Sequence, residues 1–124
     1  SVFRTEDSIS KAIATIEDIN DRALHTSITS SHLAMNQELV QRWELENLLL
    51  VAKSICYAAR SRKESRGAHF RDDFSVRLDE FNHHSLVGID DHGDCHLSRR
   101  EIDVSLFEAG GEHSEKFDFI ERSY

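Results

Sequence analysis

The chain has 124 residues, a length that fits one domain built around a single hydrophobic core. Hydrophobic residues make up 39% of it and charged residues 31%, which is typical of a soluble globular domain and excludes a disordered chain. The formal net charge of -8 disfavours nucleic acid and anionic lipid as partners, and no apolar run approaches the roughly 20 residues of a membrane span.

The first predicted element is an amphipathic helix over residues 6–26. Thr5 or Ser8 can cap its start, and acidic residues follow in its first turn, near the positive end of the helix dipole. Apolar residues recur at spacings of three and four, which places them on one face: Ile9, Ala12, Ile13, Ile16, Ile19 and Ala23. The Ser/Thr-rich run 25–32 is predicted to be a loop.

A second, longer helix is predicted over residues 36–64, with Asn36 as its cap and Gly67 as the residue that stops it. Apolar side chains surround the middle of this helix almost completely: Leu39, Val40, Trp43, Leu45, Leu48, Leu49, Leu50, Val51, Ala52, Ile55, Cys56 and Ala59. A helix that is apolar on most sides is covered on most sides. Because the first helix alone cannot cover it, we expect cover from another element.

A charged turn over residues 65–74 follows, and residues 83–107 are predicted to form a β-hairpin. The turn-rich run 90–94 marks its tip, and Ile102, Val104 and Leu106 alternate with polar residues in the period of a strand. The tail over residues 108–124 is too apolar for an ordinary free end, so we expect it to dock. The expected fold is one mainly α domain over residues 1–124, an antiparallel bundle of two to three helices with a small C-terminal β-hairpin.

The predicted hairpin carries side chains that suit zinc or copper: His83, His84, His92, Cys95 and His96. Their spacing contains no CxxC or HxxxH pair, so a native metal site is not favoured. Residues 90–101 can also be aligned with a twelve-residue calcium loop, with these ligands: Asp90, His92, Asp94, Ser98 and Glu101. Histidine is a poor ligand for a hard cation, and Cys95 stands where such a loop needs glycine. A polar hairpin turn is therefore favoured, and a small acidic interaction or calcium-binding module remains the alternative function.

The run "RKESRGAHFRDDF", residues 62–74, mixes arginine and acid. One interpretation is a solvated cluster of little energetic worth. The other is a cluster buried against another protein surface, where arginine suits desolvated, bidentate pairing. No nucleophile elbow, Gly-rich phosphate loop or zinc-protease motif accompanies it, and Cys56 lies inside a predicted helix, where thiols are usually inert. We therefore predict no catalytic residue.

The segment E-S-R-G-x-H-x-R-x-D-F over residues 64–74 resembles the C-terminal helical domain of the flavoprotein subunit of succinate dehydrogenases and fumarate reductases. Further similarities follow in the family's order: VFRTED at 2–7, NQELVQRWELENLLLVAKSI at 36–55, FSVRLDEF at 74–81, HLSRREIDVSL at 96–106 and ERSY at 121–124. L-aspartate oxidases share the S-R-G-x-H element but generally lack an R-x-Y ending, which favours the dehydrogenase and reductase branch. The chain departs from the family at Ser75, where proline is usual.

The resemblance implies a parent enzyme that interconverts succinate and fumarate at FAD and passes electrons to an iron–sulfur subunit. The family's flavin fingerprint and catalytic residues have no counterpart in this chain, so the resemblance implies scaffolding, with no catalytic, cofactor-binding or metal-binding residues here. It also implies that a preceding helix of the bundle is missing. The expected partners are the flavin-binding domain of the same subunit and the iron–sulfur subunit, with a homo-oligomer possible for the isolated chain.

The resemblance further implies a place in the cytoplasm or mitochondrial matrix, peripheral to a membrane complex and without direct membrane insertion. The charged run is then interpreted as a contact with a surface that this chain does not contain. The expected contact residues are Arg62, Glu64, Arg66, His69, Arg71, Asp73, Arg122 and Tyr124.

Overall fold

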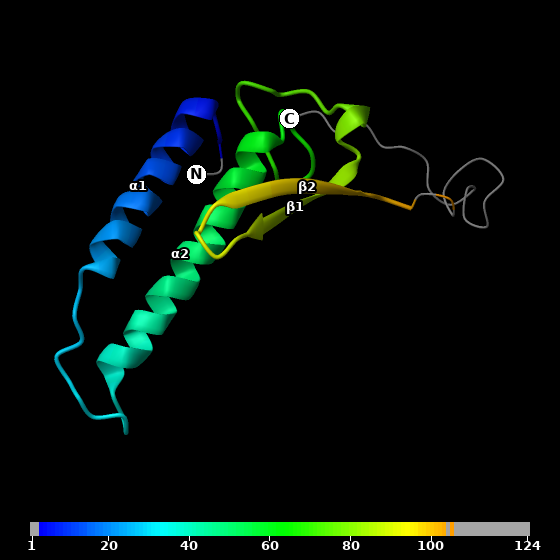
Figure 1. Cartoon of the computed structure of the whole chain (residues 1–124). Coiled ribbons are helices and arrows are strands. Elements are labelled where there is room, and N and C mark those ends of the chain that lie inside the picture. The colour runs from blue at the N-terminus through cyan, green and yellow to red at the C-terminus, as the bar shows by residue number, and fades with distance from the viewer. Residues whose placement is uncertain (1–2, 104, 106–124) are drawn as a thin grey trace.

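A computed structural model describes residues 3–103 and residue 105 of the chain. Two long helices, α1 (Glu6–Leu24) and α2 (Gln37–Ser61), run antiparallel, and a hairpin of β1 (His83–Ile89) and β2 (Cys95–Glu101) packs against α2 (Figure 1). A 3₁₀ turn, η1 (Asp79–Phe81), leads into β1. The predicted antiparallel helices and C-terminal hairpin are therefore present, but the described part holds two helices beside a sheet, a mixed α/β arrangement rather than a purely helical bundle.

Helix α1 begins where the sequence predicts, at a capping box. The Thr5 hydroxyl accepts the Ser8 N–H (3.2 Å), and the Ser8 hydroxyl accepts the Thr5 N–H (2.9 Å). Ile9, Ile13 and Ala23 are buried, which confirms the predicted apolar face. The helix ends at Leu24 rather than at residue 26, because side chains of the Ser/Thr run compete for its last carbonyls: the Thr26 hydroxyl donates to the oxygen of Arg22 (3.1 Å).

Helix α2 is capped by Asn36, whose side chain accepts the Leu39 N–H (3.1 Å), as predicted. The predicted end of α2, at residue 64, was wrong. The helix stops at Ser61, where Arg62 turns into extended backbone (ψ 100°) because its guanidinium donates to the carbonyl oxygens of Phe81 and His83. Gly67 does not stop the helix. Its positive φ of 59° instead forms a tight turn in the loop beyond.

The hairpin was predicted over residues 83–107, but its return strand lies earlier than the Ile102–Leu106 alternation suggested. The register pairs His83 with Glu101 and Ile89 with Cys95. All seven residues of β1 therefore have a partner when β2 ends at Glu101. The tight turn between Ile89 and Cys95 sets this register, and Ile102 lies beyond the strand. Val104 and Leu106 lie outside the described residues, as does the predicted docked tail over residues 108–124.

The core of the described part is small. Its buried apolar residues all lie on the two packed helices, α1 and α2: Ile9, Ile13, Ala23 and Leu49. One face of α2 is left uncovered: Leu48, Val51 and Ile55 are 67%, 53% and 57% exposed. These three residues, which we call the open face of α2, confirm that the described elements leave the helix without full cover. No helix in the described ranges is both long and apolar enough to cross a bilayer.

Candidate functional site

Part of the charged turn folds inward, away from solvent. Ser65 fixes its backbone, because the Ser65 hydroxyl accepts the Arg71 N–H (2.8 Å) and donates to the oxygen of Phe74 (2.9 Å). Arg66 and His69 exchange backbone hydrogen bonds of 2.8 and 3.0 Å across the turn that Gly67 makes possible. As a result Glu64, Ser65 and Arg71 are completely buried.

Glu64 is the centre of a first ion-pair group, the Glu64 cluster, formed with Arg62 and Arg66. Oε1 accepts from Arg62 Nη1 and from Arg66 Nε (2.9 Å), and Oε2 accepts the Leu78 N–H (3.0 Å). Burial by itself would raise the pKa of Glu64, but the bonds from Arg66, Leu78 and Arg62 outweigh it and hold the pKa below its usual range. The buried carboxylate is therefore ionised and fully paired.

Arg71 is the centre of a second group, the Arg71 cluster, formed with Asp73 and Glu6. Its Nε and Nη2 donate to the two oxygens of Asp73 (2.7 Å each), and Nη2 also reaches Glu6 (3.1 Å). Its Nη1 donates to backbone oxygens of Ala59 (3.2 Å) and Arg60 (3.3 Å) at the end of α2. The bond from Arg71 is the main cause that lowers the pKa of Asp73 to about 2.

The Arg71 cluster connects both helices. Asp73 Oδ2 accepts the Glu6 N–H (2.8 Å) in the first turn of α1, where a carboxylate is favoured by the helix dipole. The backbone adds to this connection, because Arg4 and Arg71 form an isolated parallel β-bridge. The Asp72 N–H donates to the carbonyl oxygen of Arg4 (2.8 Å). The turn thus fastens the start of α1 to the end of α2.

These contacts bear on one prediction from the sequence, that the turn meets a surface outside the chain. Arg62, Glu64, Arg66, Arg71 and Asp73 were expected to match a surface outside the chain, but their charges are paired within it. The reason is that the fold brings Phe81, His83 and the start of α1, all distant in the sequence, into contact with the charged turn.

His69 has a different environment from the paired residues of the turn. It is half-buried, with Nε2 3.3 Å from the oxygen of Arg62, and its pKa is lowered by burial and then by nearby arginines. Arg122 and Tyr124 lie outside the described residues.

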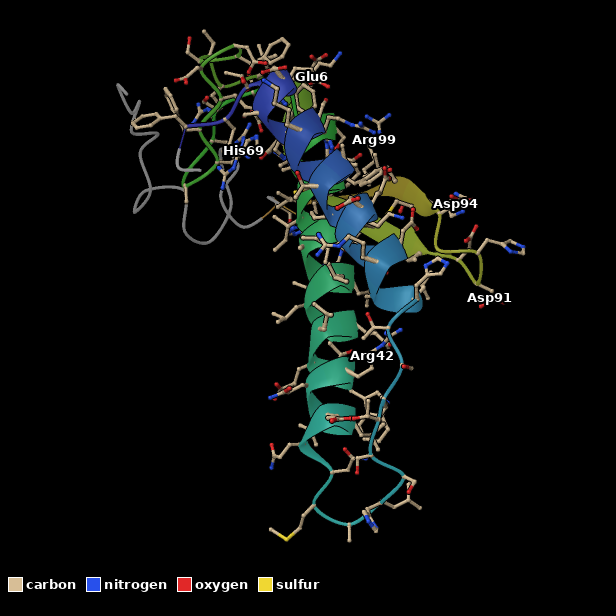
Figure 2. The ribbon with its side chains drawn as sticks, turned by 90° about the vertical axis from the view of Figure 1, so that its left-hand side faces the viewer. Glu6, Arg42, His69, Asp91, Asp94 and Arg99 are labelled. Atoms are coloured by element: carbon tan, nitrogen blue, oxygen red, sulfur yellow. The ribbon has the colours of Figure 1, made fainter. Side chains whose placement is uncertain are left out.

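Sequence reasoning missed Glu6 and Arg4 as members of this site. The acid in the first turn of α1 was interpreted only as a partner of the helix dipole. Figure 2 shows Glu6 and His69 at the same end of the molecule, while Asp91 and Asp94 lie at the hairpin tip. Nothing in the local sequence identifies the pair of Glu6 and Arg71, which lie 65 residues apart.

The hairpin tip is held by its own acid, Asp90. Its Oδ1 accepts the N–H groups of His92 and Asp94 (2.9 Å each), and Oδ2 lies 2.8 Å from His96 Nε2. The bond from His96 is the main cause that lowers the pKa of Asp90. The turn leads into β2, whereas a calcium loop leads into a helix. Across the described residues, no group of three or more His, Cys, Asp or Glu side chains is placed to hold a metal ion.

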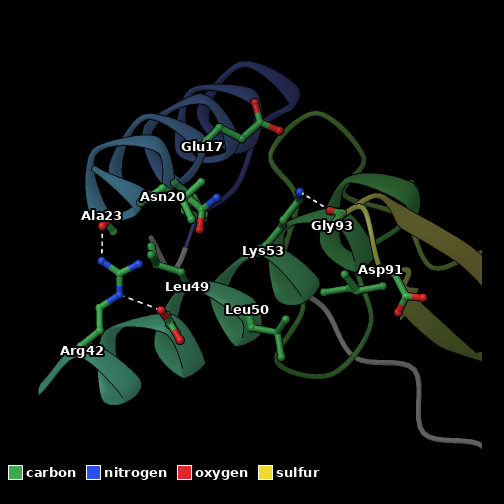
Figure 3. A pocket seen from close by; sticks show the side chains of 13 residues that line it. Glu17, Asn20, Ala23, Arg42, Leu49, Leu50, Lys53, Asp91 and Gly93 are labelled. Atoms are coloured by element: carbon green, nitrogen blue, oxygen red, sulfur yellow. Dashed lines mark hydrogen bonds and ion pairs between the residues drawn. The ribbon is translucent and has the colours of Figure 1, made fainter. Parts of the chain in front are cut away.

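A cavity of about 530 Å³ lies between α1, α2 and the hairpin turn (Figure 3). Its cations connect the surrounding elements: Lys53 Nζ donates to the oxygen of Gly93 (2.6 Å), and Arg42 donates to the oxygen of Ala23 and to Glu46 (2.6 Å). Both cations of the cavity therefore already have protein acceptors.

The sequence and the fold of this chain have counterparts among known proteins. The family described as "Fumarate reductase flavoprotein C-term" matches residues 1–124. The chain is 36% identical over 106 residues to the succinate dehydrogenase flavoprotein subunit of Rickettsia bellii, covering 85% of this chain and 18% of that protein. It is 33% identical over 107 residues to the 8-methylmenaquinol:fumarate reductase flavoprotein subunit of Wolinella succinogenes, covering 86% and 18%.

Among solved structures, an E. coli quinol fumarate reductase superposes with a TM-score of 0.78 at 30% identity, covering 82% of this chain and 18% of that chain. The described fold is therefore that of a flavoprotein C-terminal region. The chain belongs to the family of C-terminal domains of succinate dehydrogenase and fumarate reductase flavoprotein subunits. It spans about a fifth of the length of the relatives that it matches.

Proposed function

We propose that this chain is the scaffolding and docking domain of a flavoprotein subunit that interconverts succinate and fumarate. FAD and the catalytic residues belong to the remainder of that subunit, and this domain supplies no catalytic group. The relatives' names support the flavoprotein, since they are flavoprotein subunits of succinate dehydrogenase and fumarate reductase. Electrons would pass from FAD to an iron–sulfur subunit. The domain would lie in the cytoplasm or mitochondrial matrix, at the periphery of a membrane complex.

The observation that carries this proposal is the open face of α2. Three large aliphatic side chains, each more than half exposed, lie on one side of a helix whose opposite side packs on α1. Exposed apolar patches of this kind mark protein contacts. The flavin-binding domain of the same subunit is the proposed occupant, because the relatives extend well beyond the region that this chain matches.

The charged turn is proposed to serve docking both indirectly, through its shape, and directly, through two of its side chains. Arg62, Glu64, Arg71 and Asp73 are proposed to shape the turn, since their charges are paired inside the chain. Arg66 and His69 keep partly exposed side chains and are proposed as direct contacts. Arg122 and Tyr124 are proposed as direct contacts of the tail, including contacts with the iron–sulfur subunit.

The test is co-purification of this chain with the flavin-binding part of its subunit, produced as a separate polypeptide. We expect a complex that Val51→Glu with Ile55→Glu weakens at least tenfold, because two charges would be buried in an apolar contact. Ala14→Glu with Thr15→Glu, on the exposed side of α1, is the matched control and is expected to bind normally. Equal binding by both double variants would refute docking through this face.

A further inference from the structure

A shallow groove of about 440 Å³ lies beside the last turns of α2, between the charged turn and β1. Ile55, Ala58 and Ala59 form its apolar floor. Its remaining large side chains are cations or imidazoles: Arg4, Arg62, His69, His83 and His84. We call this the basic groove. No acid is present among the described residues that line it, although the whole chain has 23 Asp and Glu against 15 Lys and Arg.

The positive charge of the basic groove is only partly balanced inside the chain. Arg62 is paired with Glu64 in the cluster described above. Arg4 forms no ion pair within residues 3–103, and its Nη1 makes one long bond to the oxygen of Ala68 (3.4 Å). His84 is exposed at the rim. A carboxylate placed over Arg4 and His84 would thus meet a guanidinium and an imidazole above an apolar floor.

The register of the hairpin brings the following part of the chain to this groove. His83 lines the groove and pairs directly with Glu101, the last residue of β2. Paired residues on neighbouring strands have Cα atoms about 5 Å apart, so the chain leaves the sheet at the rim. Residues 107–120 follow within a few positions and have complementary chemistry, with four acids against one lysine. They also contain Phe107, Phe117, Phe119 and Ile120.

We propose that the basic groove is the binding site of this chain's own acidic, aromatic segment 107–120. Carboxylates of the segment pair with Arg4 and His84, and its aromatic side chains cover Ala58 and Ala59, while Ile55 at the edge of the groove stays part of the open face of α2. The short connection after Glu101 gives the segment a high effective concentration at the groove, so weak individual contacts suffice. The inference does not depend on the proposed enzyme, since it concerns one chain alone.

Chymotrypsin cleavage after Phe117 and Phe119 in the full chain tests the proposal, with the free peptide 107–124 as the unprotected reference. We expect cleavage in the full chain to be about tenfold slower than in the peptide, the scale of a few exposed ion pairs acting together with apolar burial. Arg4→Glu with His84→Glu should remove this protection. Lys11→Glu, a charge reversal on the exposed side of α1, should leave it unchanged.

A charge exchange keeps the test independent of damage to the groove. Glu115→Lys with Asp118→Lys should remove protection, measured against a peptide with the same changes, and combining these with the two groove substitutions should restore it. Failure of the combined variant to regain protection would overturn the proposal. Equal cleavage of chain and peptide would overturn it too, and protection that increases with protein concentration would assign the groove to a second copy instead.

Discussion

Replacing Arg71 with alanine should strongly destabilise this chain. The substitution removes five hydrogen bonds and leaves Asp73, Glu6 and two carbonyl oxygens at the end of α2 without their donor. Breaking a fully buried ion pair costs about 3–5 kcal/mol. Water can partly replace the lost donors here, since the side chains of Asp73 and Glu6 are 27% and 52% exposed. We therefore expect a loss of about 2–3 kcal/mol in the free energy of unfolding.

Urea denaturation monitored by circular dichroism measures this loss, and thermal melting should show a decrease of about 10 °C. Arg22→Ala is the control, because Arg22 forms an exposed pair of 3.6 Å with Asp18 and should change stability by less than about 0.5 kcal/mol. Arg71→Lys should lie between the two, since it keeps the charge but loses the bidentate geometry. A loss below about 1 kcal/mol for Arg71→Ala would support the hypothesis that the cluster serves only an external surface.

Three further perturbations test other parts of the account. Stability should fall as pH decreases from about 4 toward 2, because the folded pKa of Asp73 is lowered to about 2 and protonation breaks its ion pair with Arg71. Urea midpoints measured across this pH range should show the fall, and a flat profile would contradict it. Gly67→Ala should cost about 1–2 kcal/mol in urea denaturation because φ is 59° there, whereas Gly88→Ala, at ordinary φ with only a 3.9 Å contact, should cost less. Asp90→Ala should speed amide exchange of His92 and Asp94, and calcium titration by calorimetry should give no heat in either form; micromolar calcium binding would contradict the assignment of this turn.

Local structure could be predicted from the sequence where its causes are local. The start of α1 follows from Thr5 and Ser8, and its buried face follows from the three- and four-residue spacing of Ile9 and Ile13. Asn36 marks the start of α2 for the same reason. The open face of α2 was also predictable, since the number of apolar residues on that helix exceeds what one neighbouring helix covers.

The remainder depends on partners that are distant in sequence. α2 ends at Ser61 because Arg62 bonds to carbonyls 19 and 21 residues further along the chain. The charged turn is internal because Arg71 finds Glu6 on α1. The sequence motif identified the family and the residues of the turn. Whether their charges pair inside the chain depends on the three-dimensional arrangement.

Hydrogen exchange along α2 tests the central claim, that this domain docks through its open face. The amides from Leu48 to Ile55 are compared between this chain alone and the whole flavoprotein subunit that contains it. We predict exchange at least tenfold slower in the whole subunit, with little change in α1 from Lys11 to Thr15. Equal exchange from Leu48 to Ile55 in both forms would contradict the account.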